Sequence, residues 1–205
     1  MVPYSSKSLT LKWDYLTPGI PDELFERRED VPITKEDIRA LVISKLRLRD
    51  DYQVIDVGCG SGSITVEVCL QTKNGKVYAI DLNPEAIELT QRNLMKFGVR
   101  AELILSNAQD ALPLLPLVDA IIIGGTNGEP EEIIKLCTQH LKSKGRIVID
   151  TILIETVFKV LTAIKKEKLT DMDITQVTIS KSKTVSTGTM LTARNPVTII
   201  SATKI

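Results

Sequence analysis

The chain has 205 residues, 43% of them apolar, which is enough to bury a hydrophobic core as one α/β domain. Lys plus Arg and Asp plus Glu both number 26, and this zero formal charge argues against nucleic acid as the main partner. The sequence contains no run of about 18 apolar residues, so we expect no membrane span. The amino-terminal residues do not resemble a secretory signal, and we therefore expect a cytoplasmic protein.

Cysteine and histidine usage excludes several kinds of site. The three cysteines, Cys59, Cys69 and Cys137, show no CxxC spacing, and their odd number favours reduced thiols over a disulfide framework. His140 is the single histidine, which argues against a His-rich metal site and against a Ser-His-Asp triad. We therefore expect no metal.

Residues 1–33 differ in composition from the rest of the chain. They hold half of the eight aromatic residues, namely Tyr4, Trp13, Tyr15 and Phe25, and four of the nine prolines. This composition predicts an extended arm that packs through aromatic side chains over its own core or a neighbouring subunit. The alternative is a lid over a ligand. A single catalytic domain is then expected over residues 34–205.

Regular alternation of helices and strands begins at Thr34. Thr34 is predicted as a helix N-cap, with Asp37 completing an approximate capping box. Apolar residues then recur at helical spacing, at Ile38, Leu41, Val42 and Leu46. Asn83 is predicted to cap a second helix, which Gly98 ends.

The remaining pattern predicts an α/β fold with a mostly parallel sheet. Strands are expected at 53–57, 76–81, 102–106, 118–124, 145–150, 173–180 and 195–202, and further helices at 62–72, 83–98, 130–142 and 154–167. No crossover helix is predicted between the last two strands, so they should form an antiparallel pair. Seven strands in this arrangement are typical of a Rossmann-like class I methyltransferase dependent on S-adenosylmethionine (SAM).

The sequence VIDVGCGSGSIT, residues 54–65, places glycines where the first strand turns into a helix. Gly58, Gly60 and Gly62 permit a sharp turn and a close approach of the backbone to a ligand. A nicotinamide or flavin fingerprint requires a glycine at the position of Ser63, so the loop better suits the amino-acid end of SAM. A tight structural turn is the alternative.

Three further loops follow strands at the same edge of the sheet. Asp81 ends the second strand, where a carboxylate can accept both hydroxyls of a ribose, or can start the following helix. Asn107 and Ala108 follow the third strand, with an amide and a backbone N–H for an adenine ring. Gly124 and Gly125 belong to the loop 121–130 after the fourth strand and would leave room for a bulky acceptor. The alternative is a flexible loop that contacts no ligand.

Seven segments of the chain form a pattern that extends from residue 19 to residue 200: GIPDELF (19–25), VPITKEDIRA (31–40), VIDVGCGSGSIT (54–65), YAIDLNPEAI (78–87), IIGGTNGEPEEI (122–133), GRIVIDTILIET (145–156) and TGTMLTARNPVTII (187–200). Together they resemble one family, the decarboxylating cobalt-precorrin C15-methyltransferases (CbiT) of anaerobic cobalamin synthesis. The resemblance implies the class I fold and a homo-oligomer, commonly a tetramer. It also implies SAM contacts at Thr34, Gly58, Cys59, Gly60, Ser61, Gly62, Asp81 and Ala108.

The acceptor that the resemblance implies is a cobalt-precorrin, a reduced tetrapyrrole. Its C12 acetate side chain would lose carbon dioxide while the bridging carbon C15 gains a methyl group. Arg194 is our candidate for binding acceptor carboxylates, with Gly124 and Gly125 as further candidates at the acceptor, although Arg194 also reads as a surface residue of a hairpin. No general base or other catalytic residue is assigned.

Three alternative functions remain at this point. A tRNA methyltransferase of the same fold is disfavoured by the neutral charge. A nicotinamide-dependent oxidoreductase is disfavoured by the glycine spacing and by the antiparallel end of the sheet. A binding module that retains the SAM pocket without catalysis is the third.

Overall fold

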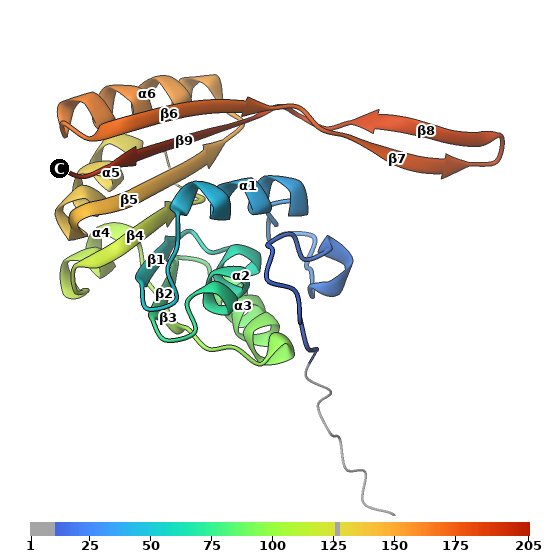
Figure 1. The fold of residues 1–205 in the computed structure, drawn as a ribbon, viewed down its shortest axis with the longest axis horizontal. Coiled ribbons are helices and arrows are strands. Elements are labelled where there is room, and N and C mark those ends of the chain that lie inside the picture. The colour runs from blue at the N-terminus through green and yellow to red at the C-terminus, as the bar shows by residue number, and fades with distance from the viewer. Residues whose placement is uncertain (1–10, 126–127) are drawn as a thin grey trace, which may run out of the picture.

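A seven-stranded sheet forms the centre of the molecule, with strand order β3-β2-β1-β4-β5-β9-β6. The computed structural model describes residues 11–125 and 128–205, so the predicted arm residue Tyr4 lies outside it. The strands of the sheet are β1 (Gln53–Val57), β2 (Lys76–Asp81), β3 (Glu102–Leu105), β4 (Val118–Ile123), β5 (Leu141–Thr151), β6 (Thr170–Val177) and β9 (Val197–Thr203) (Figure 1). Strands β1 to β5 pair in parallel, and β9 pairs antiparallel with both β5 and β6. The predicted fold class is confirmed.

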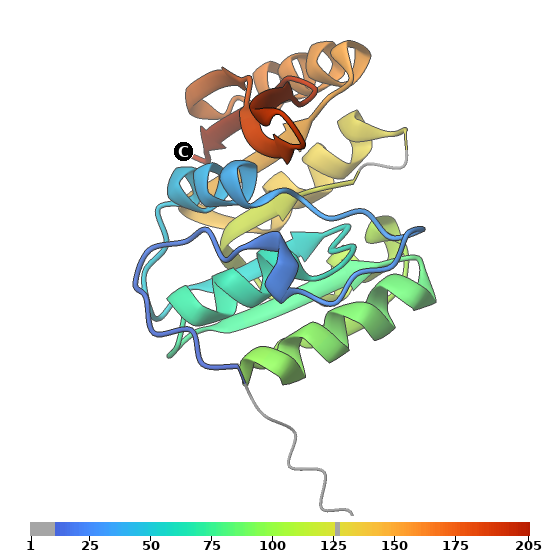
Figure 2. The ribbon, with the colours of Figure 1, turned by 90° about the vertical axis from the view of Figure 1, so that its right-hand side faces the viewer.

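Helices cover both faces of this sheet (Figure 2). One face carries α1 (Glu36–Leu46), α2 (Ser63–Gln71) and α3 (Pro84–Phe97), and the other carries α4 (Ala108–Ala111), α5 (Pro130–His140) and α6 (Ile154–Lys166). Two short 3₁₀ helices, η1 (Asp22–Leu24) and η2 (Leu112–Leu114), complete the described helices. Among the described residues, no helix is long and apolar enough to span a membrane.

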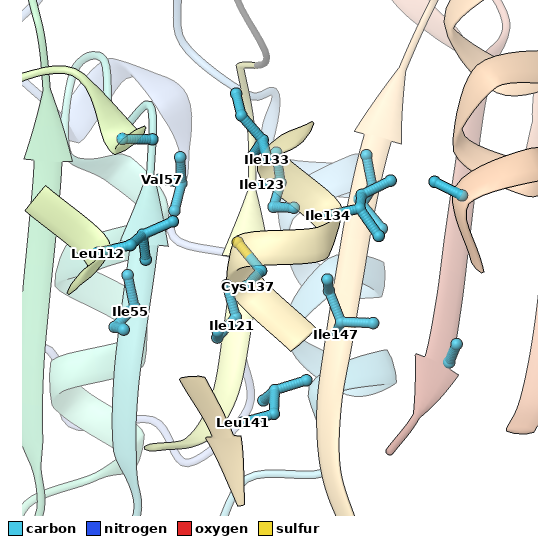
Figure 3. Close-up of a cluster of buried hydrophobic side chains, with 14 of the residues drawn as sticks. Ile55, Val57, Leu112, Ile121, Ile123, Ile133, Ile134, Cys137, Leu141 and Ile147 are labelled. Atoms are coloured by element: carbon cyan, nitrogen blue, oxygen red, sulfur yellow. The ribbon is translucent and has the colours of Figure 1, made fainter. Parts of the chain in front are cut away.

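The central strands are buried on both sides, which explains their nearly continuous apolar sequences. Figure 3 shows Ile134 and Cys137 of α5 packed against Ile121 and Ile147 of the sheet. All three cysteines are free and buried. Burial raises the pKa of the Cys69 thiol to about 12, so this thiol stays protonated and behaves as a small apolar side chain.

A two-stranded hairpin stands away from the body of the molecule (Figure 1). It consists of β7 (Ser180–Val185) and β8 (Gly188–Ala193), which pair only with each other. The sequence pattern predicts no strand between residues 181 and 194. The hairpin has no buried face, so its sequence lacks the apolar alternation that reveals a half-buried strand.

The predicted N-cap at Thr34 is wrong. Helix α1 begins at Glu36, and no side chain at its cap position accepts a hydrogen bond. Instead Oδ1 of Asp22 accepts a hydrogen bond of 2.9 Å from the Glu36 amide, so a residue 14 positions upstream caps the helix. Asp37 completes no capping box and forms an ion pair with Lys181, at 3.1 Å. The arm folds over this helix end and supplies a better-placed carboxylate than the local hydroxyl.

A buried arginine attaches the arm to the core. The side chain of Arg39 is fully buried, and its Nε donates to Oε1 of Glu67 at 2.6 Å, while Nη1 donates to Oδ1 of Asp22 at 3.2 Å. Glu67 also accepts hydrogen bonds from the amides of Gly19 and Ile20, at 2.8 and 2.9 Å. The described part of the arm therefore lies over its own core.

Aromatic packing supports the same attachment. The guanidinium of Arg39 lies 4.7 Å from the ring centroid of Phe25, and the Phe25 and Phe97 rings lie 4.9 Å apart. Phe25 is buried in the core cluster that α1, α2 and α3 form with the sheet. Trp13 packs at the edge of this cluster, with its ring 4.8 Å from that of Tyr15.

Replacing Arg39 with Met should lower the free energy of unfolding by about 3–5 kcal/mol, because two buried carboxylates lose their partner. Guanidinium titration followed by circular dichroism measures this loss. The matched control is Arg92→Met, which removes an exposed pair with Glu88 at i,i+4 and should cost under about 1 kcal/mol. Equal losses in the two variants would contradict the role assigned to Arg39.

Candidate active site

The glycine turn after β1 forms the base of the candidate site. Gly58, Gly60 and Gly62 have φ angles of +75°, +55° and +73°, which residues with a Cβ rarely adopt. A Cβ on Gly58 would lie 2.8 Å from the backbone nitrogen of Gly125, in the loop after β4. The two loops therefore touch through glycine backbones, and no side chain fits between them.

The other two glycines pack against protein rather than against open space. A Cβ on Gly60 would lie 2.9 Å from the carbonyl oxygen of Pro32, and one on Gly62 would lie 2.6 Å from the Thr90 side chain. The amide of Ser61 donates to the same Pro32 carbonyl, at 3.2 Å. The turn is thus enclosed by the end of the arm on one side and by α3 on the other.

Asp81 is held beside this turn. Its Oδ2 accepts a hydrogen bond from the Gly60 amide and its Oδ1 accepts one from the Asn83 amide, each of 2.9 Å. A carboxylate has about four acceptor positions, so each oxygen keeps one for a ligand. Asn83 in turn caps α3 by accepting from the Glu85 amide, as predicted. Both readings of Asp81, helix start and ligand contact, are therefore compatible.

A cavity of about 300 Å³ brings four of the predicted cofactor residues together, namely Gly58, Gly60, Asp81 and Ala108. Three others, Cys59, Ser61 and Gly62, do not line it. Their side chains or Cα atoms face the packed interior, where Cys59 contacts the Thr90 hydroxyl at 3.5 Å. Thr34 does not line this cavity either.

The loop after β3 ends the cavity on the opposite side. Asn107 lines it, but its Oδ1 accepts from the Asp110 amide at 2.8 Å, so its side chain caps α4. Ala108 is the first residue of α4, and amides in a first helical turn have no partner inside the helix. A hydrogen bond from this loop to a ligand is therefore expected from a backbone amide rather than from the Asn107 side chain.

A second, larger cavity of about 770 Å³ adjoins the first. Gly124 and Gly125 line both, so the two cavities meet at the carboxyl end of β4. Thr34 and Arg194 line the larger cavity, as do five residues that the sequence analysis did not single out, namely Lys35, Asp150, Thr151, Thr156 and Asn195. Asp150 could have been found from the sequence, because ligands in parallel sheets bind beyond the carboxyl ends of strands.

Arg194 lies where the projecting hairpin returns to the body. Its amide donates to the Ile179 carbonyl at 2.9 Å, and its Nη1 lies 3.6 Å from Oδ2 of Asp37. Lys181 also contacts Asp37, so a pair of cations at the hairpin base faces the start of α1. Nη1 of Arg194 has no hydrogen-bond partner among residues 11–125 and 128–205. Oδ2 of Asp37 likewise has no hydrogen-bond partner among these residues, so the two shielded groups face each other at ion-pair distance beside the larger cavity.

Two carboxyl groups on the sheet have raised pKa values. Burial raises the pKa of Asp56 to about 6, against the lowering effect of a 2.6 Å hydrogen bond from Thr65. Burial raises the pKa of Asp150 to about 7, and the nearby Asp56 carboxylate adds to the rise. Asp56 lies below the glycine turn and lines neither cavity, whereas Asp150 faces the larger one.

Comparison with known proteins gives a consistent result. Residues 23–204 match the family described as precorrin methyltransferase domain. A protein of Saccharolobus solfataricus named probable cobalt-precorrin-6B C(15)-methyltransferase (decarboxylating) is 46% identical, over 95% of this chain and 100% of its own. A protein of the same name from Methanocaldococcus jannaschii is 44% identical, over 90% of this chain and 98% of its own.

Solved structures agree with these relatives. A precorrin-6y C5,15-methyltransferase of Geobacter metallireducens is 34% identical with a TM-score of 0.86, over 94% of this chain and 100% of that one. A tRNA (m1A58) methyltransferase of Aquifex aeolicus has a TM-score of 0.74, over 88% of this chain and 72% of that one, but only 19% identity, which shows a shared fold alone. The sheet order, the glycine turn and the match over residues 23–204 lead to one conclusion: the chain belongs to the precorrin methyltransferase family.

Proposed function

We propose that this protein transfers a methyl group from SAM to C15 of a cobalt-precorrin and removes carbon dioxide from the C12 acetate side chain of the same molecule. The observation that carries the proposal is the meeting of two cavities at Gly124 and Gly125. The smaller cavity, whose lining includes the glycine turn and Asp81, opens there into a cavity of about 770 Å³. The larger volume suits a bulky acceptor.

The smaller cavity fits SAM. Gly58 and Gly60 line this cavity without side chains, so a ligand there can lie against their backbone. Asp81 keeps acceptor positions for the ribose hydroxyls, and the first turn of α4 offers amides to the adenine. When bound, SAM supplies the methyl group as an activated electrophile. Of the predicted contacts, Cys59, Ser61 and Gly62 would shape the turn and only Gly58, Gly60, Asp81 and Ala108 would face the cofactor.

The larger cavity would hold the tetrapyrrole. Its lining is mainly apolar, with Ile152 and Leu153 on one side and Val177 and Val197 on another, which suits the flat body of a macrocycle. Lys35 and Arg194 are its cationic residues within the described chain and would bind peripheral carboxylates through charge-assisted hydrogen bonds. The protein's contribution is to place the bridging carbon beside the methyl group and to exclude water.

The neighbouring functions have less support. Curated relatives that share 41–46% identity over nearly the whole chain carry the cobalt-precorrin name, whereas the likeness to the tRNA enzyme extends to the fold alone. The chain's neutral charge agrees with this preference. We propose a cytoplasmic location for this enzyme, in line with the biosynthetic names of its relatives.

We also propose that the protein self-associates, as a tetramer, through the β7–β8 hairpin. An isolated two-stranded sheet is marginally stable in water, and this hairpin exposes Met190 and Leu191 at 49% and 69%. A second exposed apolar group lies at the start of α6, at Ile154 and Phe158. A second copy of the chain has both an unpaired strand edge and an apolar surface to cover these residues.

The first prediction tests the reaction and its cofactor site together. The purified protein, given SAM with a labelled methyl group and reduced cobalt-precorrin, should release one carbon dioxide for each methyl transferred. Asp81→Ala should weaken SAM binding at least tenfold in calorimetry and leave the melting curve of the apoprotein nearly unchanged. Unchanged SAM affinity in this variant would remove the cofactor assignment, and methylation of tRNA but not of the tetrapyrrole would favour the alternative.

A second prediction concerns Arg194. Arg194→Ala should raise the KM for the tetrapyrrole about tenfold or more, because a charge-assisted contact contributes about 1.5–3 kcal/mol. The KM for SAM should stay within about twofold. Steady-state kinetics with each substrate varied in turn measures both values, and Arg47→Ala, at a cation far from the cavity, is the control. Equal increases in the two KM values would contradict the role.

A third prediction concerns assembly. Light scattering should give a mass of four times the 22.7 kDa chain. Leu191→Asp places a charge on the exposed hairpin and should shift the protein toward smaller species, with an unchanged circular dichroism spectrum. The control is Leu114→Asp, at a leucine that is 86% exposed on η2, away from the hairpin. A monomeric wild-type protein would refute the assembly proposal without affecting the reaction.

A further inference from the structure

One polar group in the larger cavity has no function in the proposed binding scheme. Asp150 lies near the carboxyl end of β5 and lines this cavity together with Thr151 and Thr156. Its Oδ1 is shielded from solvent and has no hydrogen-bond partner among residues 11–125 and 128–205. A shielded carboxylate oxygen without a partner is costly, whereas a protonated carboxyl group at the same place offers a donor to the cavity.

The surroundings favour the protonated form. The negative charge of Asp56 on β1 opposes ionisation of Asp150. Lys35, just before α1, and Arg194, just after β8, line the same cavity, but no ion pair within the described residues joins either to Asp150, and Arg194 lies beside Asp37. Ile199, which pairs with Asp150 on β9, is uncharged, as is Gly124, which lines the cavity after β4.

The proposed reaction requires an acid inside a cavity that excludes water. Loss of carbon dioxide from an acetate side chain leaves an electron pair on its methylene carbon, and the product methyl group needs one proton there. Among the described residues that line the larger cavity, Asp150 is the one carboxylic acid, and the cavity contains neither histidine nor cysteine nor tyrosine. Lys35 and Arg194, the cations of this lining, are assigned to the carboxylates of the acceptor in the proposed scheme.

We propose that Asp150 is the general acid that protonates the decarboxylated side chain of the acceptor, an inference that rests on the proposed function. The bond between the methylene and the carboxylate breaks, carbon dioxide leaves, and the electron pair takes the proton from the Asp150 carboxyl group. The acetate becomes a methyl group and Asp150 becomes a carboxylate. Asp150 regains a proton from water when the product leaves, and the bridging carbon that exchanges hydrogen for methyl releases one proton in return.

The position of Asp150 is consistent with this transfer. Gly124 and Gly125, where the two cavities meet, follow β4, and β4 is the parallel neighbour of β5. An acid on β5 therefore lies beside the junction without blocking it. A pKa near 7 also matches the range in which a general acid is effective, since about half of the groups are protonated at pH 7 and the proton is still given up readily.

The kinetic test uses Asp150→Asn, which keeps the shape of the side chain but removes its proton. General acids contribute about 10²–10⁴ in rate, so kcat for carbon dioxide release should fall at least ~100-fold, while SAM affinity by calorimetry should stay within about twofold. Asp150→Glu should retain more activity than Asp150→Asn. Glu155→Gln, at an exposed carboxylate on the first turn of α6, is the matched control and should leave both measurements unchanged.

Two pH measurements separate an acid from a merely structural residue. The wild-type rate should fall on the basic side with a midpoint near 7, and the residual rate of Asp150→Asn should lack this limb. Independently of activity, ¹³C NMR of the apoprotein labelled at aspartate carboxyl carbons should show one resonance that titrates near pH 7 and is missing in Asp150→Asn. A titration below about pH 5 would overturn the inference.

The two proposals fail in distinguishable ways. A wild-type protein that binds SAM but converts no cobalt-precorrin would refute the proposed reaction. A wild-type protein that is active, together with an Asp150→Asn variant of similar rate and the same basic limb, would refute only the role of Asp150. A variant that loses SAM affinity or melts at a much lower temperature while Asp150→Glu remains inactive would assign Asp150 to structure instead.

Discussion

The buried cluster of Arg39, Glu67 and Asp22 is the constraint on which the site depends. Its three charged groups are almost completely removed from solvent, so each requires the others to offset the cost of desolvation. Arg39 also binds the carbonyl oxygens of Thr34 and Ile20, and so fixes both ends of residues 20–34, the last part of the arm before α1. That segment includes Pro32, whose carbonyl contacts the glycine turn and whose side chain borders both cavities. A contact remote from the chemistry thus determines the shape of the pocket wall.

The two cavities divide the chemistry of the site between backbone and side chains. The smaller one is built from glycine backbone, amides of a first helical turn and one carboxylate, which suits a nucleoside cofactor that is recognised in the same way in many proteins. The larger one is built from side chains contributed by the arm, by β5 and by the residues that flank the hairpin. Substitutions among the residues of the larger cavity can therefore change substrate specificity without disturbing the cofactor site in the smaller cavity.

Burial on the sheet also explains why so few ionisable groups are available for catalysis. The thiols of Cys59 and Cys137 lie in the core, where burial raises their pKa values far above neutrality. Asp56 is bonded to Thr65 and lies beneath the turn. Among residues 11–125 and 128–205, Asp150 alone combines a raised pKa with a place on the larger cavity, which is consistent with a reaction in which both substrates already carry most of the reactivity.

The sequence by itself determined the sheet, the glycine turn and the place of Asp81, because alternating hydrophobicity, glycine spacing and strand ends are local signals. It also contained the segments that indicate the family. Only the tertiary structure decided that Asp22 rather than Thr34 caps α1, that Cys59, Ser61 and Gly62 face the interior, and that residues 180–193 form a projecting hairpin. The same holds for the shielded oxygen of Asp150. Each of these features depends on contacts between residues far apart in the chain. A local sequence pattern cannot predict which distant residue a side chain will contact.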